Sequence, residues 1–140
     1  MKALYVESSA LGRAFLHGDH EAHAALHSAA RGRAAFTSEL TRAELLRALH
    51  RPRAREGRDR SEAEAKIARA LRQMDLVPVG GEILRRVGES FPREYLGTLD
   101  AIHLATALHL SAQDVITDLV VLTRDARVRE NAMALRLKVA

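Results

Sequence analysis

Short apolar segments recur along the sequence, and most are followed by a stretch whose apolar residues repeat with helical spacing. Residues 3–6 form the first such segment, and the stretch after it places apolar residues at i, i+3, i+4 and i+7: Ala22, Ala25, Leu26 and Ala29. A strand buried on both faces reads as one continuous apolar run, because helices cover both sides of its sheet. The alternation therefore predicts an α/β fold, a parallel sheet flanked by helices on both faces.

The other elements follow from the same patterns. Strands are expected over residues 34–37, 76–79, 119–122 and 137–139, and helices over about 19–31, 40–50, 82–90, 98–110 and from 126. Pro52 would end the second helix, and Pro78 indicates an edge strand or a strand end. The charged residues 53–60 indicate a loop. Ser61 and Glu64 then match a capping box at the start of another helix.

Composition narrows the functional classes. The 140 residues include no cysteine, which excludes disulfides and thiolate metal sites, and they fit one domain over 1–140. No apolar run is long enough to span a membrane and no signal peptide is evident, so we expect a cytoplasmic protein. The net charge of +4 and pI of about 10.1 would suit a polyanionic partner, although an Arg-rich composition explains them equally well.

Acidic residues stand at strand ends and helix starts. Glu7 ends the first strand, Glu44 lies early in the helix after the second strand, Asp100 opens an apolar helix, and Asp125 follows the strand at 119–122. These ends gather in one crevice of an open parallel sheet. Gathered carboxylates repel one another unless a cation neutralises them, and oxygen ligands suit Mg²⁺ or Mn²⁺. The pattern predicts a metal site suited to phosphoryl chemistry.

Three of these acids have an alternative interpretation. Glu7, with Ser8 and Ser9, could form a strand-end turn or a helix N-cap, and Asp125 could cap the last helix. Glu44 could form a capping box with Thr41, or surface ion pairs with Arg47 and Arg51. Asp100 is harder to explain structurally, because its helix is apolar on every side and a buried carboxylate is unfavourable unless it is paired or metal-bound. A helix-dipole role is its remaining alternative.

Four segments together resemble the PIN-domain family, in its VapC toxin branch. They are residues 5–11 (YVESSAL), 37–45 (TSELTRAEL), 99–107 (LDAIHLATA) and 121–125 (VLTRD), which stand in the family's order and span nearly the whole chain. The resemblance implies a PIN fold, RNA cleavage dependent on Mg²⁺ or Mn²⁺, homodimerisation, and neutralisation by a VapB-type antitoxin.

Carried over by position, the resemblance assigns an acidic catalytic site to Glu7, Glu44, Asp100 and Asp125. Glu7, Asp100 and Asp125 would bind the metal, and Ser8 and Thr123 would support it by hydrogen bonding. The segment between Leu110 and Thr123 is longer than usual, which leaves Asp118, and after it Asp114, as substitutes for Asp125.

Glu7 departs from the family pattern, which has Asp at this position. The extra methylene moves the carboxylate by roughly an ångström, whereas Mg²⁺ requires near-ideal geometry at about 2.0–2.1 Å. A tolerated natural variant, a weakened enzyme and an engineered attenuation all fit the sequence. If Glu7 binds the metal, Glu7→Asp should increase cleavage.

Basic residues and histidines add further hypotheses. Arg47 and Arg51 begin a basic stretch on the face that carries Glu44, and phosphate contacts there would guide RNA; a solvated helix end and loop explains them as well. The rest of the stretch is Arg53, Arg55, Arg58 and Arg60. The histidines of one helix face could in principle bind Zn²⁺, but this face should be solvated: His20, His23 and His27. We expect His103 to form hydrogen bonds within the fold rather than bind metal or act as a base.

Three functions remain open at this point. A metal-dependent endoribonuclease comes first, and a PIN-like protein whose site has decayed at Glu7, acting through its antitoxin or RNA binding, comes second. A phosphatase of another acid-rich α/β class comes third, since the Asp-x-Asp signature expected after its first strand is missing.

Overall fold

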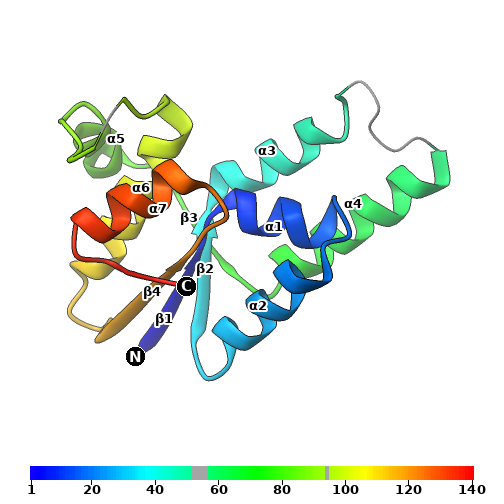
Figure 1. Ribbon diagram of the computed structural model, residues 1–140, viewed down its shortest axis with the longest axis horizontal. Coiled ribbons are helices and arrows are strands. Elements are labelled where there is room, and N and C mark those ends of the chain that lie inside the picture. Colours follow the sequence, from blue (N-terminus) through cyan, green and yellow to red (C-terminus); the bar gives the residue numbers. More distant parts are fainter. Residues whose placement is uncertain (52–56, 94) are drawn as a thin grey trace.

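The sheet is parallel throughout. The computed structural model describes residues 1–51, 57–93 and 95–140, and its five strands have the order β3-β2-β1-β4-β5 (Figure 1). The strands are β1 (Lys2–Val6), β2 (Ala34–Ser38), β3 (Asp75–Val77), β4 (Asp118–Leu122) and β5 (Lys138–Val139). The predicted α/β class and parallel sheet are therefore confirmed.

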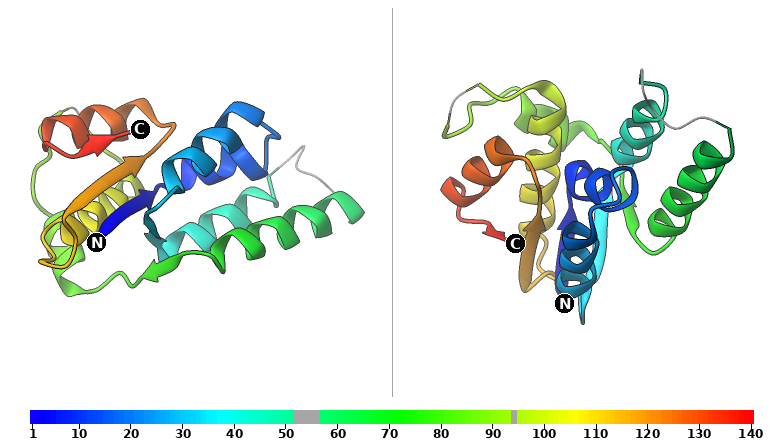
Figure 2. Two further views of the ribbon diagram at one scale, coloured as in Figure 1. Left: turned by 90° about the horizontal axis from the view of Figure 1, so that it is seen from below. Right: turned by 45° about the vertical axis from the view of Figure 1, so that its right-hand side comes forward.

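Helices cover both faces of this sheet (Figure 2). They are α1 (Ser8–Phe15), α2 (His20–Ala30), α3 (Glu39–Ala48), α4 (Gly57–Leu71), α5 (Gly81–Val87), α6 (Thr98–Ser111) and α7 (Ala126–Ala134). Buried residues of α1 to α4 pack in one apolar cluster, whereas α5, α6 and α7 contribute to clusters on the other side. None of the helices described has the length and apolar composition needed to cross a membrane.

The central strand β1 explains why two layers of helices are required. Leu4 and Val6 pack with α1 to α4, while Ala3 and Tyr5 pack with α6 and β4. All four side chains are at most 1% exposed. Alternate side chains of a strand point to opposite faces, so a strand that is apolar on both faces needs a helical layer on each side.

The helices differ from the prediction in two places. Helix α1 was not predicted, because its eight residues are too few to show a clear period, although Glu7 does cap it as one alternative proposed. Helix α4 begins at Gly57, so residues 57–60 are helical and Ser61 stands inside the helix rather than at its cap. The capping box of Ser61 and Glu64 is therefore wrong, because Arg-rich sequence before it continues the helix. The rest of the predicted loop, 53–56, lies outside the described residues, as does Pro52.

Strand boundaries shifted by a residue or two. Strand β3 ends at Val77 and is an edge strand, which agrees with the edge position that Pro78 indicated. The order of the sheet reverses at β1, since the chain adds β2 and β3 on one side of it and β4 and β5 on the other. The carboxyl ends of β1 and β4, which are hydrogen-bonded neighbours, therefore form the edge where a crevice is expected.

Candidate active site at the carboxyl ends of the strands

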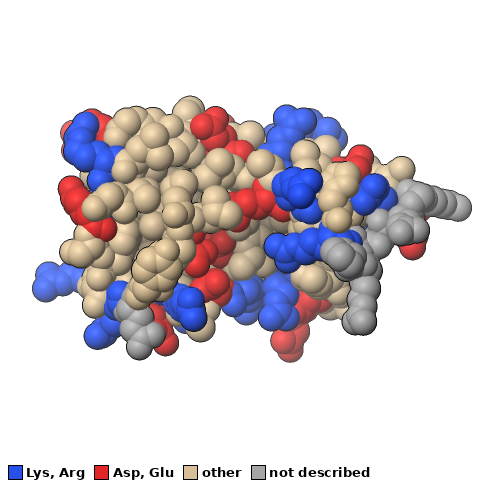
Figure 3. Space-filling model, turned by 90° about the horizontal axis from the view of Figure 1, so that it is seen from above, with Lys and Arg blue, Asp and Glu red and all other residues tan. Residues whose placement is uncertain are grey.

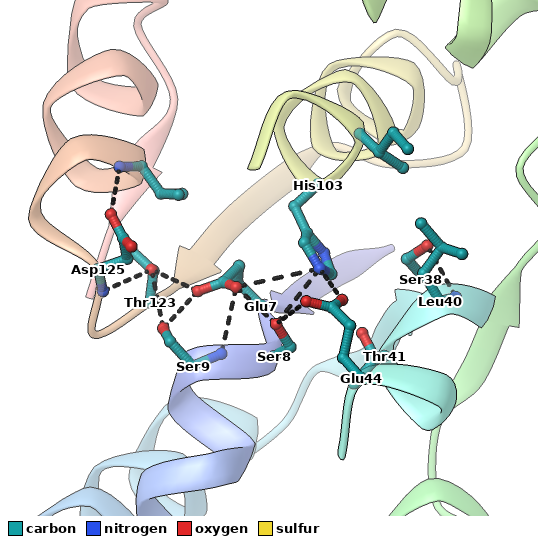
Figure 4. A network of polar contacts seen from close by, with 12 residues as sticks. Glu7, Ser8, Ser9, Ser38, Leu40, Thr41, Glu44, His103, Thr123 and Asp125 are labelled. Carbon is teal, nitrogen blue, oxygen red and sulfur yellow. Dashed lines mark hydrogen bonds and ion pairs between the residues drawn. The ribbon is translucent and has the colours of Figure 1, made fainter. Parts of the chain in front are cut away.

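Glu7 follows β1 and is held by a ring of hydroxyl groups. Its Oε1 accepts from Ser8 Oγ at 2.8 Å and from the Ser9 backbone N–H at 3.2 Å, which caps α1. Its Oε2 accepts from Thr123 Oγ1 at 2.8 Å and from Ser9 Oγ. The side chain is only 3% exposed. Glu7 therefore links the ends of β1 and β4, and both its oxygens are already engaged (Figure 4).

Glu44 lies on α3 and reaches toward Glu7 through shared partners. Its Oε2 accepts from Ser8 Oγ at 3.1 Å, and its Oε1 lies 2.6 Å from His103 Nε2. The predicted capping box with Thr41 is wrong, because the N-cap of α3 is Ser38. Thr41 is buried inside the helix instead, with its hydroxyl 2.8 Å from that of Thr37. Glu44 thus faces the acidic cluster rather than capping its own helix.

His103 lies on α6 and is fully buried at 1% exposure. Its Nδ1 is 2.6 Å from the hydroxyl of Tyr5, and burial raises the pKa of that phenol well above its usual value, so the phenol keeps its proton. The expected hydrogen-bonding role of His103 is confirmed. Tyr5 and Ser9 were missed as members of this cluster, although a buried tyrosine hydroxyl generally requires a partner, which was the available signal.

Asp125 follows β4 and caps α7. Its Oδ1 accepts from the backbone N–H groups of Arg127 and Val128 at 2.9 and 3.0 Å. Its own N–H donates to Thr123 Oγ1 at 3.1 Å, and that hydroxyl in turn donates to Glu7. The hydroxyl group of Thr123 therefore ties the segment of Asp125 to the segment of Glu7.

Asp100 stands in the first turn of α6 and is partly buried. Burial raises the pKa of its carboxyl group, and the negative charges of Asp125, Glu7 and Glu44 raise it further, against a lowering contribution from His103. The four predicted acids are therefore within electrostatic reach of one another. Acidic side chains gather near the middle of this face, with basic side chains beside them (Figure 3).

The proposed substitutes for Asp125 do not belong to this site. Asp118 is the first residue of β4, at the opposite end of the strand, where it pairs with Arg33 at 2.7 Å and Lys138 at 2.6 Å. Asp114 is exposed in the loop that leads into that same end. Asp118 and Asp114 are thus wrong as substitutes, because the parallel pairing of Val6 with Leu122 places Asp125 at the end of the sheet that carries Glu7, and places Asp118 at the other end.

The donor set suits a hard divalent cation. The cluster offers carboxylate and hydroxyl oxygens. Burial, and after it the neighbouring negative charges, raise the pKa of Asp100, and a cation would neutralise those charges. Within residues 1–51, 57–93 and 95–140, no three His, Cys, Asp or Glu side chains are already arranged around one cation position. Mg²⁺ is commonly held by one or two carboxylates, with water and substrate phosphate completing its shell, so the residues fit this ion.

The chain matches known proteins over nearly its whole length. A family model described as PIN domain matches residues 4–133. Ribonuclease VapC46 of Mycobacterium tuberculosis (strain ATCC 25618 / H37Rv) is 36% identical over 141 residues, which cover 99% of this chain and 97% of that protein. This chain belongs to the PIN-domain family.

Solved structures share the fold of this PIN domain. FitAcB from Neisseria gonorrhoeae aligns with a TM-score of 0.72 at 17% identity, covering 97% of this chain and 95% of that one. VapBC2 from Rickettsia felis, bound to a DNA fragment from its promoter, aligns with a TM-score of 0.69 at 12% identity, covering 98% and 97%. At these identities the similarity establishes the fold alone.

The basic residues noted in the sequence differ in their surroundings in this PIN domain. Arg47 and Arg51 are exposed near the end of α3, as a phosphate contact requires. Arg60, predicted to lie in a loop, belongs to α4 and donates to the backbone oxygen of Leu49 at 2.5 Å. Arg53 and Arg55, and the side chain of Arg58, lie outside the described residues.

The histidine face of α2 is exposed, as predicted. The rings of His23 and His27 stack with centroids 6.1 Å apart, and they line a cavity of about 700 Å³ between α2 and α4 together with His20. The described part of the chain has no group of three ligands around these rings that could hold zinc. The acidic cluster remains the candidate site of the molecule.

Proposed function

We propose that this PIN domain is a metal-dependent endoribonuclease and the toxin of a VapBC-type toxin–antitoxin pair. The observation that carries the proposal is the gathering of Glu7, Glu44, Asp100 and Asp125 from four separate segments, with the pKa of Asp100 raised by burial and by its acidic neighbours. The 36% identity to a ribonuclease over nearly the whole chain supports RNA as the substrate.

In this proposal Asp100, Asp125 and Glu7 hold Mg²⁺ or Mn²⁺. The bound ion would lower the pKa of a water molecule and neutralise charge that develops on the phosphate. Ser8 and Thr123 hold the carboxylates in place through their hydroxyl groups. Arg47 and Arg51 contact the RNA backbone, a contact that weakens as salt concentration rises.

The partners follow from the same proposal. Solved relatives of this fold include a toxin–antitoxin complex from Klebsiella pneumoniae, and we propose a VapB-type antitoxin and a second copy of this chain as partners here. We also propose that the protein acts in the cytoplasm, where its RNA substrate is found.

A second candidate is a PIN domain with little or no catalysis, acting through its antitoxin or RNA binding. It is favoured by Glu7, whose two carboxylate oxygens already accept hydrogen bonds from Ser8, Ser9 and Thr123. In that case the cluster would hold the fold together and would not bind a cation strongly.

Incubation of the purified protein with mixed RNA tests the two candidates. The nuclease should cleave RNA with Mn²⁺ or Mg²⁺, lose this activity in EDTA, and lose it in the Asp100→Asn variant. RNA binding that persists without cleavage, at every metal concentration tried, would establish the second candidate instead.

A further inference from the structure

The cluster contains a series of hydrogen-bonded side chains to which the proposed function assigns no role. Tyr5 on β1, His103 on α6 and Glu44 on α3 follow one another through two contacts of 2.6 Å, Tyr5 Oη to His103 Nδ1 and His103 Nε2 to Glu44 Oε1. Figure 4 shows the second of these contacts. Tyr5 and His103 are each 1% exposed, whereas the side chain of Glu44 is 24% exposed. This hydrogen-bonded series therefore runs from the core of the molecule to its acidic face.

The direction of these hydrogen bonds follows from the groups themselves. An ionised carboxylate has lone pairs but no hydrogen, so Glu44 can only accept and Nε2 of His103 must donate. In the neutral imidazole the other nitrogen, Nδ1, is then an acceptor, and the phenol of Tyr5 can donate to it. Tyr5 thus selects the tautomer of His103 that holds Glu44.

Glu44 has reason to need such a partner. A glutamate side chain has several rotatable bonds, and ordering it costs conformational entropy. With Oε1 held by a buried imidazole, Oε2 points toward Ser8, whose hydroxyl also contacts Glu7. The carboxylate therefore contacts two elements, α6 and α1, besides its own helix.

We propose that His103, oriented by Tyr5, is a positioning residue that fixes the Glu44 carboxylate for RNA cleavage. The expected effect on the rate of RNA cleavage rests on the proposed nuclease function. Removing a group that orients a metal ligand generally lowers activity or metal affinity by about 10- to 100-fold, and we expect an effect of the same order for a group that orients Glu44. A role in the core alone would change stability and leave the turnover of the folded protein unaltered.

The hydrogen bonds are tested first in the metal-free protein, without RNA. Histidine labelled with ¹⁵N should show His103 with its proton on Nε2 and none on Nδ1, and Glu44→Gln should shift the Nε2 resonance. His109, a partly exposed histidine on the same helix, serves as the control whose resonance should not move. A bare Nε2 would overturn the proposal, and a proton on Nδ1 would overturn the part assigned to Tyr5.

Kinetics of the folded variants test the positioning role. His103→Leu should lower kcat by about 10- to 100-fold with little change in KM, and Tyr5→Phe, which removes a single oxygen, by several-fold. His103→Gln should recover much of the activity, because its amide can donate to Glu44. His109→Gln is the matched control and should behave as wild type.

A double-mutant cycle separates this role from general disruption. In the Glu44→Gln background, His103→Leu should change kcat by less than about twofold, because the group that it positions is already altered. A full loss repeated in that background, or equal losses for His103→Leu and His103→Gln, would refute positioning. Should wild type show no metal-dependent cleavage, the proposed nuclease fails, and the ¹⁵N spectra still decide whether His103 holds Glu44.

Discussion

Carboxyl groups at the two ends of the parallel sheet have pKa shifts in opposite directions. At the amino end, Asp118 pairs with Arg33 and Lys138, and these hydrogen bonds lower the pKa of its carboxyl to about 2. At the carboxyl end, burial and like charges raise the pKa of Asp100. One end is thus arranged as a structural ion-pair network. The other keeps negative charges close together, which is characteristic of functional sites.

The difference shows why acidic residues alone do not identify a site. Asp118 begins β4 and Asp125 follows it, so each end of this strand has an aspartate and only the surroundings of the two differ. Arg33 also donates to the backbone oxygens of Ala3 and Asp118, so its guanidinium serves the fold. Charge repulsion at the carboxyl end is a cost in stability that a bound cation would remove.

The largest effect is expected from Asp125→Asn. Asparagine caps helices about as well as aspartate, so α7 should remain intact while one negative charge is lost from the cluster. We expect RNA cleavage to fall by about 100-fold or more, with a small change in Tm, measured in a metal-supplemented assay and by thermal unfolding.

Asp19→Asn is the matched control for this change. Asp19 caps α2 in the same manner, through a hydrogen bond from Ala22 N–H of 3.1 Å, but lies outside the cluster. Equal losses of activity in the two variants would mean that Asp125 acts only as a cap.

The next effect concerns the glutamate that departs from the family pattern. Glu7→Asp shortens the side chain and should release it from part of its ring of hydroxyl groups, while aspartate remains a good cap for α1. We expect metal-dependent cleavage to rise by up to about tenfold, in line with the strict geometry of Mg²⁺. Equal or lower activity would argue against a role for Glu7 in binding metal.

A smaller effect is expected on RNA binding. Arg47→Gln should weaken binding to RNA by a few-fold and reduce the slope of log K against log salt by about 0.7 to 1. Arg31→Gln is the control, since Arg31 is exposed where α2 ends and the chain enters the amino end of the sheet. Titrations at several salt concentrations measure the binding constant and the slope. A slope for Arg47→Gln equal to that of wild type would show that Arg47 does not contact the RNA backbone.

The smallest effects concern stability against pH and compare the two ends directly. The lowered pKa of Asp118 stabilises the fold above its ordinary value of 3.8, and this contribution is lost as pH falls toward about 2. Asp118→Asn should therefore flatten the decrease of the urea midpoint over this acidic range. A decrease as steep as in wild type would show that its ion pairs contribute little.

Asp100 should behave in the opposite sense. Its pKa is raised, so the folded state binds the proton more strongly and loses stability as pH rises above 3.8. Asp100→Asn removes this loss. In EDTA the urea midpoint of the variant should increase relative to that of wild type as pH rises. A difference between the two midpoints that does not change with pH would contradict the raised pKa.

Much of the fold was predictable because strands and helices have different periods. Residues 3–6 and 119–122 are continuous apolar runs, which only a sheet covered on both faces accommodates. Helix α1 and the start of α4 could not be predicted, because α1 is short and the first turn of α4 is too polar to show a buried stripe. Such segments are helical through tertiary packing and capping.

The gathering of the four acids was predictable from their places at strand ends and in the early turns of helices, whereas their hydrogen-bond partners were not predictable. Hydrogen bonds such as Tyr5 to His103 join residues 98 positions apart, and no local pattern encodes them. Asp118 illustrates the converse, since a loop of unusual length made it a plausible ligand until the strand register placed it at the other end.

Ser8 lies between two carboxylates with a single hydroxyl hydrogen. Its Oγ is 2.8 Å from Glu7 and 3.1 Å from Glu44, and the hydrogen can serve only one of them at a time. A ligand that takes over one carboxylate therefore leaves the hydroxyl to the other. Binding at one carboxylate would therefore strengthen the hydrogen bond of Ser8 to the other, so this single hydroxyl would couple the start of α1 to Glu44 on α3.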